Sequence, residues 1–168
     1  MLIFLVGFMG SGKTSVGKQL ARMMNYKFFD TDALIEEREG KTIEQLFEMN
    51  GETYFRNCES KIITEFFEMK DAVISCGGGT PCFNNNMALM NQHGITVYLK
   101  MEPEALKHRL MNAKKRRPLM LNISEDNMLN EIREKLQTRE PVYMQAKIML
   151  NGLDVDLNLL HKSIQYFH

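Results

Sequence analysis

The chain has 168 residues, of which 44% are hydrophobic and 25% are charged, a composition typical of one globular domain. Its 21 basic and 21 acidic side chains cancel, which argues against a protein that binds nucleic acid or an acidic membrane through its overall charge. The three cysteines are odd in number and form no C-x-x-C pair, so we expect neither a disulfide framework nor a zinc knuckle.

The first predicted element is the apolar run Leu2–Val6, which has the length and composition of a buried parallel strand. This run is too short for a signal peptide or a membrane span and has no basic segment before it, so we expect a soluble, cytoplasmic protein. A helix is expected over Lys13–Met24, and a second strand over Lys27–Phe29, ending at Asp30.

The long connection after the second strand reads as entirely helical. Thr42 and Gln45 have the spacing of a capping box, which predicts a helix through Phe47. A longer helical pattern runs from about Glu52 to Met69. We therefore expect this connection to form a subdomain beside the sheet, at about residues 31–62.

The rest of the chain alternates between strands and helices, except for a basic, aperiodic segment over residues 113–124. This alternation predicts an α/β fold with a parallel sheet of five strands. Pro141 is expected to interrupt the last but one helix. The remaining elements are expected at Ala72–Cys76 (strand), Asn85–His93 (helix), Thr96–Lys100 (strand), Pro103–Asn112 (helix), Ser124–Arg139 (helix capped by Ser124), Lys147–Asn151 (strand) and a final helix.

The stretch Val6–Ser15, VGFMGSGKTS, contains the pattern G-x-x-x-x-G-K-[ST] between a predicted strand and a predicted helix. Glycines let the backbone turn tightly and present its N–H groups inward, and a helix N-terminus favours anions. Lys13 supplies a mobile positive charge to terminal phosphates, and Thr14 offers its hydroxyl to Mg²⁺. The pattern therefore predicts a nucleoside triphosphate site, for ATP or GTP, rather than a glycine turn without a ligand.

Three absences indicate what happens to the phosphate. The sequence has no Asn-Lys-x-Asp, which GTPases use to read guanine. The third predicted strand runs into Ser75, Cys76 and Gly77, without the acid that many P-loop ATPases place there. The chain is also too short to contain a second domain that moves. These features favour a small-molecule kinase over a switch or a motor.

Two carboxylates follow the second strand, Asp30 and Asp32. They belong to the edge of the sheet where ligands bind in open α/β folds. Asp30 could hold Mg²⁺, and Asp32 could accept a hydroxyl proton from the phosphoryl acceptor. The structural alternative is that one of them only caps the next helix.

Four further segments carry candidate binding residues, and three of them have a plain structural explanation when taken alone. Arg56 could be a solvated helix residue, and Arg139 could complement a helix dipole. Gly77–Gly79 cost backbone entropy at the end of a buried strand, which makes sense if a ligand must approach the main chain. Arg116–Arg117 could be a solvated charge run or part of a loop that folds over the transferring phosphate.

Taken together and in order, these stretches resemble the shikimate kinase family over nearly the whole chain. Each is weak alone except the phosphate loop, but six in order at family-like spacing are highly specific. The stretches are Gly7–Thr14, Phe29–Asp32, Gly51–Arg56, Gly77–Gly79, Arg117–Leu119, and Arg139 with Pro141 and Tyr143.

The resemblance implies transfer of the γ-phosphate of ATP to the 3-hydroxyl of shikimate, on the route to chorismate and the aromatic amino acids. It implies a P-loop NTPase fold of the nucleoside-monophosphate-kinase type. In such a fold a five-stranded parallel sheet flanked by helices carries a helical substrate-binding subdomain and a lid, here at about residues 112–124.

The resemblance also assigns roles to individual positions, and Mg²⁺ is the implied cofactor. For adenine, His108 is as close in register as Arg109, and Glu59 could either orient Arg56 or lie at the surface. The implied residues are, for ATP, Gly10, Ser11, Gly12, Lys13, Thr14, Ser15, Arg109 and Arg117; for Mg²⁺, Thr14 and Asp30; for shikimate, Asp32, Arg56, Gly78 and Arg139; and for catalysis, Lys13, Asp32 and Arg117.

Two other functions remain as alternatives. Another small-molecule kinase of the same fold, such as a gluconate kinase, would share the phosphate loop and the lid. Arg56, Arg139 and the glycine triplet favour shikimate over gluconate. Arginine can bind the carboxylate of shikimate bidentately. A silent ATP-reporting module would be free to lose Lys13, Asp30 or Asp32, and all three are present. We expect a monomer with shikimate and ATP as its ligands, because no coiled coil or exposed apolar face is evident.

Overall fold

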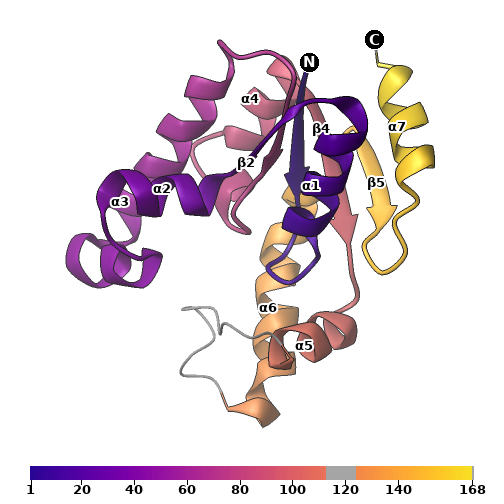
Figure 1. Ribbon diagram of the computed structural model, residues 1–168. Coiled ribbons are helices and arrows are strands. Elements are labelled where there is room, and N and C mark those ends of the chain that lie inside the picture. The colour runs from indigo at the N-terminus through magenta and orange to yellow at the C-terminus, as the bar shows by residue number, and fades with distance from the viewer. Residues whose placement is uncertain (113–123, 168) are drawn as a thin grey trace.

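The computed structural model of the chain describes residues 1–112 and 124–167 (Figure 1). The predicted lid, at about residues 112–124, falls almost entirely on residues outside this range. In chain order the elements are β1 (Leu2–Val6), α1 (Lys13–Met24), β2 (Lys27–Asp30), α2 (Thr31–Glu39), α3 (Ile43–Phe66), β3 (Ala72–Ser75), the 3₁₀ turn η1 (Thr80–Cys82), α4 (Asn86–His93), β4 (Ile95–Lys100), α5 (Pro103–Met111), α6 (Glu125–Tyr143), β5 (Ile148–Asn151) and α7 (Leu157–Gln165).

The five strands form one parallel sheet in the order β2-β3-β1-β4-β5, which confirms the predicted sheet. The central strand β1 lies between β3 and β4, and all its residues are buried. The chain leaves β1 for β2 on one side of the sheet and later crosses to β4 on the other side. The loop after β1 therefore lies at the switch point of the sheet's carboxyl edge, where open α/β folds bind their ligands.

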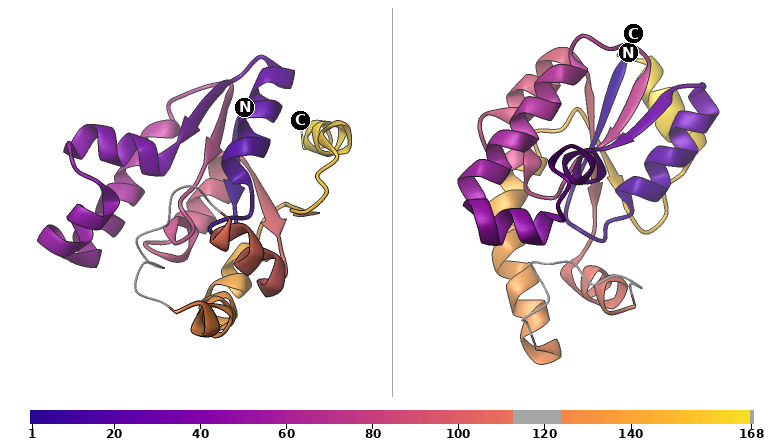
Figure 2. Two further views of the ribbon diagram at one scale, coloured as in Figure 1. Left: turned by 60° about the horizontal axis from the view of Figure 1, so that its bottom comes forward. Right: turned by 60° about the vertical axis from the view of Figure 1, so that its left-hand side comes forward.

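Helices cover both faces of the sheet, with α1 and α7 on one face and α3, α4 and α6 on the other (Figure 2). The alternation of side chains along β1 serves both layers. Ile3 and Leu5 pack in one core with Leu20 of α1 and Leu160 of α7. Phe4 points to the other face and joins the larger core, formed with α3, α4 and α6. Two apolar layers thus hold the sheet rigid, and its carboxyl edge is left for the site.

The connection between β2 and β3 is helical, as the sequence predicts, and projects from the sheet as α2 and α3 (Figure 1). The predicted capping box is present, since the amide of Gln45 donates to the Thr42 hydroxyl and the amide of Thr42 donates to the Gln45 side chain. Gly51 has φ 82° and ψ 171°, so it divides α3 into two helical segments. The second segment carries the buried Phe55 and Arg56 toward the sheet edge.

Two local predictions about α6 are wrong. The helix does not end before Pro141 but runs to Tyr143, because the amide of Met144 still donates to the Glu140 carbonyl at 2.8 Å and the Tyr143 ring is fully buried. Ser124 precedes the helix as predicted, but its side chain makes no capping bond. Its carbonyl accepts from the amides of Asn127 and Met128 instead.

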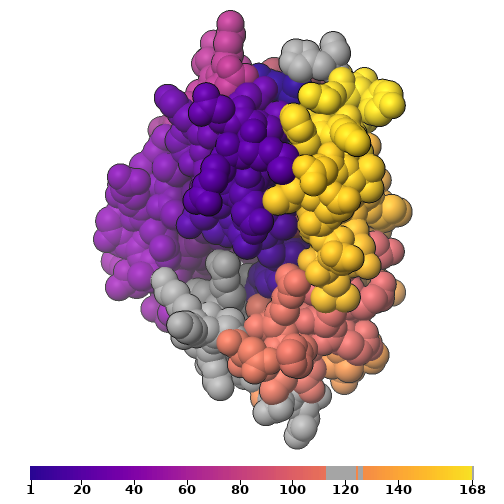
Figure 3. All heavy atoms as spheres, turned by 45° about the vertical axis from the view of Figure 1, so that its right-hand side comes forward, coloured from indigo at the N-terminus to yellow at the C-terminus, as the bar shows by residue number. Residues whose placement is uncertain are grey.

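The last helix, α7, packs against α1 on the outer face of the sheet (Figure 3). Leu160 and Ile164 supply its buried side, and the Asp156 carboxylate caps it by accepting from two backbone amides. Within the residues that the structure describes, no helix is long and apolar enough to cross a membrane.

Candidate active site

The loop between β1 and α1 forms the phosphate side of the site. Gly10 and Gly12 have φ of 84° and 95°, which only glycine adopts without strain, and Gly12 is the N-terminal cap of α1. The Lys13 side chain is buried, and its ammonium group donates to the carbonyls of Gly7 at 2.9 Å and Phe8 at 2.8 Å. A cation and a helix N-terminus therefore meet in one loop, as a polyphosphate site requires.

Thr14 and Asp30 lie together beside this loop. The Thr14 hydroxyl donates to Oδ2 of Asp30 at 2.9 Å and lies 3.4 Å from the Ser75 hydroxyl. The other oxygen of Asp30 accepts from the amides of Asp32 and Ala33, so Asp30, and not Asp32, caps the following helix. This set of hydroxyl and carboxylate oxygens fits Mg²⁺, which prefers hard oxygen ligands and takes the rest from water and substrate phosphates.

Asp32 stands between two adjoining cavities. The first, which we call the phosphate cavity, has a volume of about 270 Å³ and is lined by the phosphate loop and by Thr14 and Asp30. The second, which we call the acceptor cavity, has a volume of about 240 Å³ and is lined by α3, by Arg139 of α6 and by the glycine turn after β3. Asp32 lines both, together with Met9, Gly77 and Gly78. A hydroxyl bound to Asp32 from the second cavity would thus face a phosphate held in the first.

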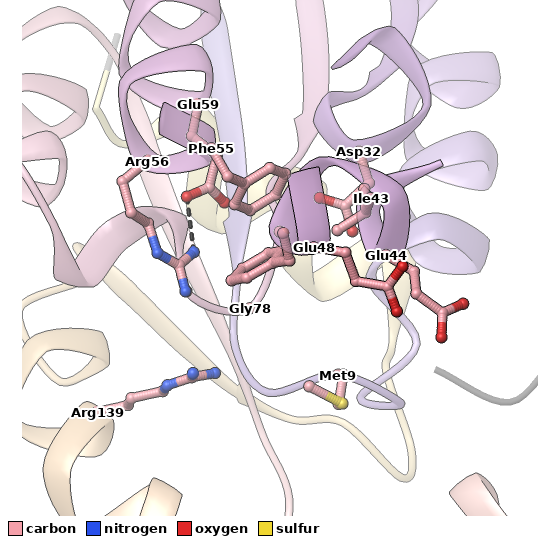
Figure 4. Close-up of a pocket in the computed structure, with 13 residues that line it drawn as sticks. Met9, Asp32, Ile43, Glu44, Glu48, Phe55, Arg56, Glu59, Gly78 and Arg139 are labelled. Carbon is pink, nitrogen blue, oxygen red and sulfur yellow. Dashed lines mark hydrogen bonds and ion pairs between the residues drawn. The ribbon is translucent and has the colours of Figure 1, made fainter. Parts of the chain in front are cut away.

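The second cavity has opposite charges on its two sides (Figure 4). Arg56 and Arg139 point their guanidinium groups into it from one side, and Asp32 lies on the other side with Glu44 and Glu48. Such a cavity orients a ligand that carries a carboxylate at one end and hydroxyls at the other.

Arg56 is buried and held by two carboxylates at helical spacing. Its Nη1 donates to Glu59 at 2.7 Å, and its Nε and Nη2 donate to Glu52 at 3.1 and 2.9 Å. The ring of Phe83 lies 4.1 Å from the guanidinium carbon, at cation–π distance. These bonds use three of the five N–H donors of a guanidinium and leave one donor on each terminal nitrogen for a ligand.

Glu59 is almost fully buried, so the surface alternative for this residue is wrong. Its second oxygen accepts from the hydroxyl of Thr80. Burial raises the pKa of Glu59, against the opposing effects of the Arg56 charge and of the Thr80 hydrogen bond. Burial alone would lower the pKa of Arg56, but the carboxylates of Glu59 and Glu52 outweigh it and raise that pKa. Glu59 thus orients Arg56, as one of the two sequence interpretations holds.

Arg139 faces the same cavity from α6. Its Nη1 atom is buried and has no hydrogen-bond partner among the residues that the structure describes. A buried guanidinium nitrogen without an acceptor is costly, so this atom marks a place for an anionic ligand.

The glycine triplet makes room for the protein's own side chains. A Cβ at Gly77 would lie 2.5 Å from the Asp32 carboxylate and 3.0 Å from that of Glu59. A Cβ at Gly79 would overlap the guanidinium of Arg56. The triplet therefore has a second role besides the predicted close approach of a ligand, because it leaves room for the side chains of Asp32, Glu59 and Arg56. The sequence alone does not reveal this role.

The remaining predicted ATP residues that the structure describes lie around the phosphate loop. Arg109 donates to the carbonyls of Gly10 at 3.5 Å and Gly152 at 3.3 Å, whereas His108 contacts Asn112. Ser15 lines the phosphate cavity, and the hydroxyl of Ser11 is buried within the loop. Arg117 lies outside the described residues. The structure therefore places Arg109, rather than His108, beside the phosphate loop.

Several residues that line the acceptor cavity are absent from the sequence prediction. Ile43 and Phe47 are four residues apart on α3, as are Glu44 and Glu48, so each pair lies on one helix face. The capping box at Thr42 fixes where this helix begins, and that spacing is the signal that could have revealed them. The sequence does not say that this face turns toward Arg139, because that depends on how α3 packs.

Comparisons with known proteins agree with this geometry. The family model for shikimate kinase matches residues 9–158. The chain is 50% identical over 154 residues to a shikimate kinase of Phocaeicola vulgatus, with 92% of this chain and 88% of that protein covered. It superposes on the crystal structure of shikimate kinase from Bacteroides thetaiotaomicron with a TM-score of 0.89, at 41% identity and with 99% and 96% of the two chains covered.

A second solved structure is informative because of its ligand. The shikimate kinase of Acinetobacter baumannii, solved in complex with shikimate, matches with a TM-score of 0.86 at 34% identity, over 99% of this chain and 91% of that one. A gluconokinase from Sinorhizobium meliloti matches with a TM-score of 0.57 at 15% identity, over 97% and 89%, which is a likeness of fold alone.

Proposed function

The chain belongs to the shikimate kinase family, and from that premise we propose that its two cavities transfer the γ-phosphate of ATP to the 3-hydroxyl of shikimate. The observation that carries the proposal is the position of Asp32 in the walls of both cavities. The reacting hydroxyl has to lie where the phosphate cavity and the acceptor cavity meet, and Asp32 is the titratable side chain shared by their walls.

The acceptor cavity would bind shikimate through its two charged sides. Arg56 and Arg139 would hold the carboxylate, Arg56 with the two donors that Glu52 and Glu59 leave available. The amide of Gly78 would contribute a hydrogen bond from the wall between the cavities. Asp32 would bind the hydroxyl groups and accept the proton of the attacking hydroxyl.

The phosphate cavity would bind the triphosphate of ATP. Lys13, the loop amides and the Thr14–Asp30 pair carry the groups for this role. Thr14 and Asp30 would hold Mg²⁺, which neutralises developing charge on the phosphates when bound. We also propose that Arg117 completes the phosphate site and that Arg109 contacts the nucleotide beyond Gly10. Phosphoryl transfer needs positioning and positive charge more than covalent chemistry, and these residues supply both.

We retain as proposals the monomer, the cytoplasmic location, and residues 31–62 as the substrate-binding subdomain. Helices α2 and α3 provide Asp32, Arg56 and much of the acceptor wall, which supports the last of these. Cys58, Cys76 and Cys82 are unpaired thiols, as is usual in a reducing compartment.

The test is release of ADP from Mg-ATP with and without shikimate, in the wild type and in Asp32→Asn. We expect shikimate to stimulate release in the wild type, and the substitution to lower kcat about 10²- to 10⁴-fold because it removes a general base. Asp156→Asn is the matched control, because Asp156 caps α7 and lines neither cavity, and asparagine also caps helices well. Gluconate is tested in parallel. Stimulation by gluconate alone, or full activity in Asp32→Asn, would refute the proposal.

A further inference from the structure

Tyr143 belongs to the sequence stretch that contains Arg139, but it is not among the residues proposed to bind either substrate. It is the last residue of α6, and its side chain is fully buried. Its hydroxyl donates to the carbonyl of Gly78 at 2.5 Å, a contact that spans 65 residues of sequence. Its ring packs against that of Tyr98, with centroids 5.2 Å apart.

Gly78 is the middle residue of a turn that has little intrinsic rigidity. Three successive glycines lose much backbone entropy when they are ordered. Two side chains from different helices fix this turn. The hydroxyl of Thr31 accepts from the amide of Gly77 at 2.9 Å, and the hydroxyl of Tyr143 donates to the carbonyl of Gly78. The amide of Gly78, between these two bonds, has no acceptor within residues 1–112 and 124–167.

Tyr143 also lies beside Arg139. The two residues are four apart on α6 and so share a helix face. A Cβ at Gly78 would lie 3.7 Å from Nη1 of Arg139, the buried nitrogen without a partner in the described chain. Burial raises the pKa of Tyr143, and the positive charge of Arg139 and hydrogen bonding to it act in the opposite direction. The phenol group therefore donates to the glycine turn and also lies beside Arg139.

We propose that Tyr143 is a positioning residue that fixes the Gly78 amide and the Arg139 guanidinium relative to each other in the acceptor cavity. The inference rests on the proposed function, because these two groups are the ones assigned to shikimate. The hydroxyl group of Tyr143 does not contact the substrate. It restricts the backbone of the glycine turn before the substrate binds, so that less conformational entropy is lost on binding.

The experiment compares Tyr143→Phe with Tyr98→Phe. Both substitutions remove one hydrogen-bonded hydroxyl from the same pair of rings and leave the rings in place, since the Tyr98 hydroxyl donates to Glu140 at 3.1 Å. For Tyr143→Phe we expect KM for shikimate to rise about ten-fold, the effect of one lost buried hydrogen bond, and KM for ATP to change less than two-fold. For Tyr98→Phe we expect both KM values to stay within two-fold of the wild type.

A purely structural role for Tyr143 would give a different result. Loss of stability alone would lower the melting temperature in both variants, and it would not change KM for shikimate more than KM for ATP. An unchanged KM for shikimate in Tyr143→Phe, or an equal rise in both KM values, would overturn the proposal.

A measurement without turnover keeps the inference separate from the proposed function. The amide of Gly79 shares a peptide plane with the carbonyl of Gly78. Its ¹H–¹⁵N resonance in the ligand-free protein should therefore shift in Tyr143→Phe and stay in place in Tyr98→Phe. A wild type that shows no shikimate-dependent turnover would refute the proposed function. An unshifted Gly79 resonance in Tyr143→Phe would refute the positioning role, whatever the substrate.

Discussion

The two adjoining cavities are built in opposite ways. Half of the residues that line the phosphate cavity come from one continuous segment, residues 9–15, which supplies backbone amides, a buried lysine and the start of a helix. The acceptor cavity is assembled from α2, α3, the turn after β3 and α6, and its main groups are long side chains. In the proposed function, the first cavity binds a group common to many enzymes, whereas the second has to recognise one particular molecule.

The difference shows how each cavity is specified, one by a local sequence motif and the other by the packing of separate elements. A loop between a strand and a helix has few ways to turn, so a short sequence motif can specify a phosphate site by itself. A cavity formed by several separate segments depends on how those segments pack. One of its arginines, Arg56, is therefore held by additional partners, Glu52, Glu59 and Phe83.

The strongest test of this division removes the central charge of the phosphate cavity. We expect Lys13→Met to lower kcat about 10²- to 10³-fold, because one donor to the developing charge is lost. Shikimate binding to the nucleotide-free protein, measured by calorimetry, should be unchanged. Lys18→Met is the control, since Lys18 is exposed on the same helix. Loss of shikimate binding in Lys13→Met would show that the two cavities do not act separately.

The converse substitution lies in the acceptor cavity. We expect Arg139→Lys to raise KM for shikimate about ten- to one-hundred-fold and to leave KM for ATP unchanged, because lysine cannot bind a carboxylate bidentately. Steady-state kinetics with each substrate varied in turn measures both values. Arg133→Lys is the control on the same helix, where Arg133 pairs with the exposed Glu104. Equal effects on both KM values would remove Arg139 from the acceptor side.

The smallest expected effect concerns Glu59 and pH. Its pKa in the folded protein lies above the ordinary 4.5, so the folded state holds this proton more tightly than the unfolded chain does. The stability that this group contributes is thus present at low pH and decreases as pH rises through the folded pKa. Binding responds in the other direction, because protonation at low pH weakens the attraction of Glu59 for Arg56.

We therefore expect KM for shikimate in the wild type to rise a few-fold, on the order of the contribution of one buried hydrogen bond, as pH falls toward 4.5 from above. Glu59→Gln should have a raised KM that no longer varies over this range. Glu65→Gln is the control, because Glu65 pairs with Arg38 at the surface of the same helix. A wild-type dependence that survives in Glu59→Gln would assign the titration to another group.

Much of the fold could be predicted because the signals are local. The apolar strands, the capping box at Thr42 and the phosphate loop are each specified within about ten residues of sequence, and all are present. The prediction at Pro141 is wrong because the packing of the Tyr143 ring, a tertiary effect, outweighs the missing amide of proline.

The acceptor site could be predicted only as a set of candidates. The resemblance to a family pointed to Arg56 and Arg139, but their partners follow from contacts across the fold. That Asp30 meets Thr14 of α1, and that Gly79 gives space to Arg56 of α3, are facts of three-dimensional packing. No local pattern encodes such contacts, since the residues involved belong to separate elements that meet only in the fold.

The glycine turn also limits how this enzyme could be redirected to a new acceptor. Gly77 and Gly79 are already the smallest residues, and the space beside them is filled by Asp32 and Arg56. Removing side-chain atoms from that wall therefore cannot enlarge the cavity, and adding them would displace the groups that we propose to bind the acceptor. The opposite wall, where Ile43, Glu44, Phe47 and Glu48 line the cavity, carries no such restriction. Natural divergence or directed evolution of acceptor choice should therefore concentrate its substitutions on the first two turns of α3.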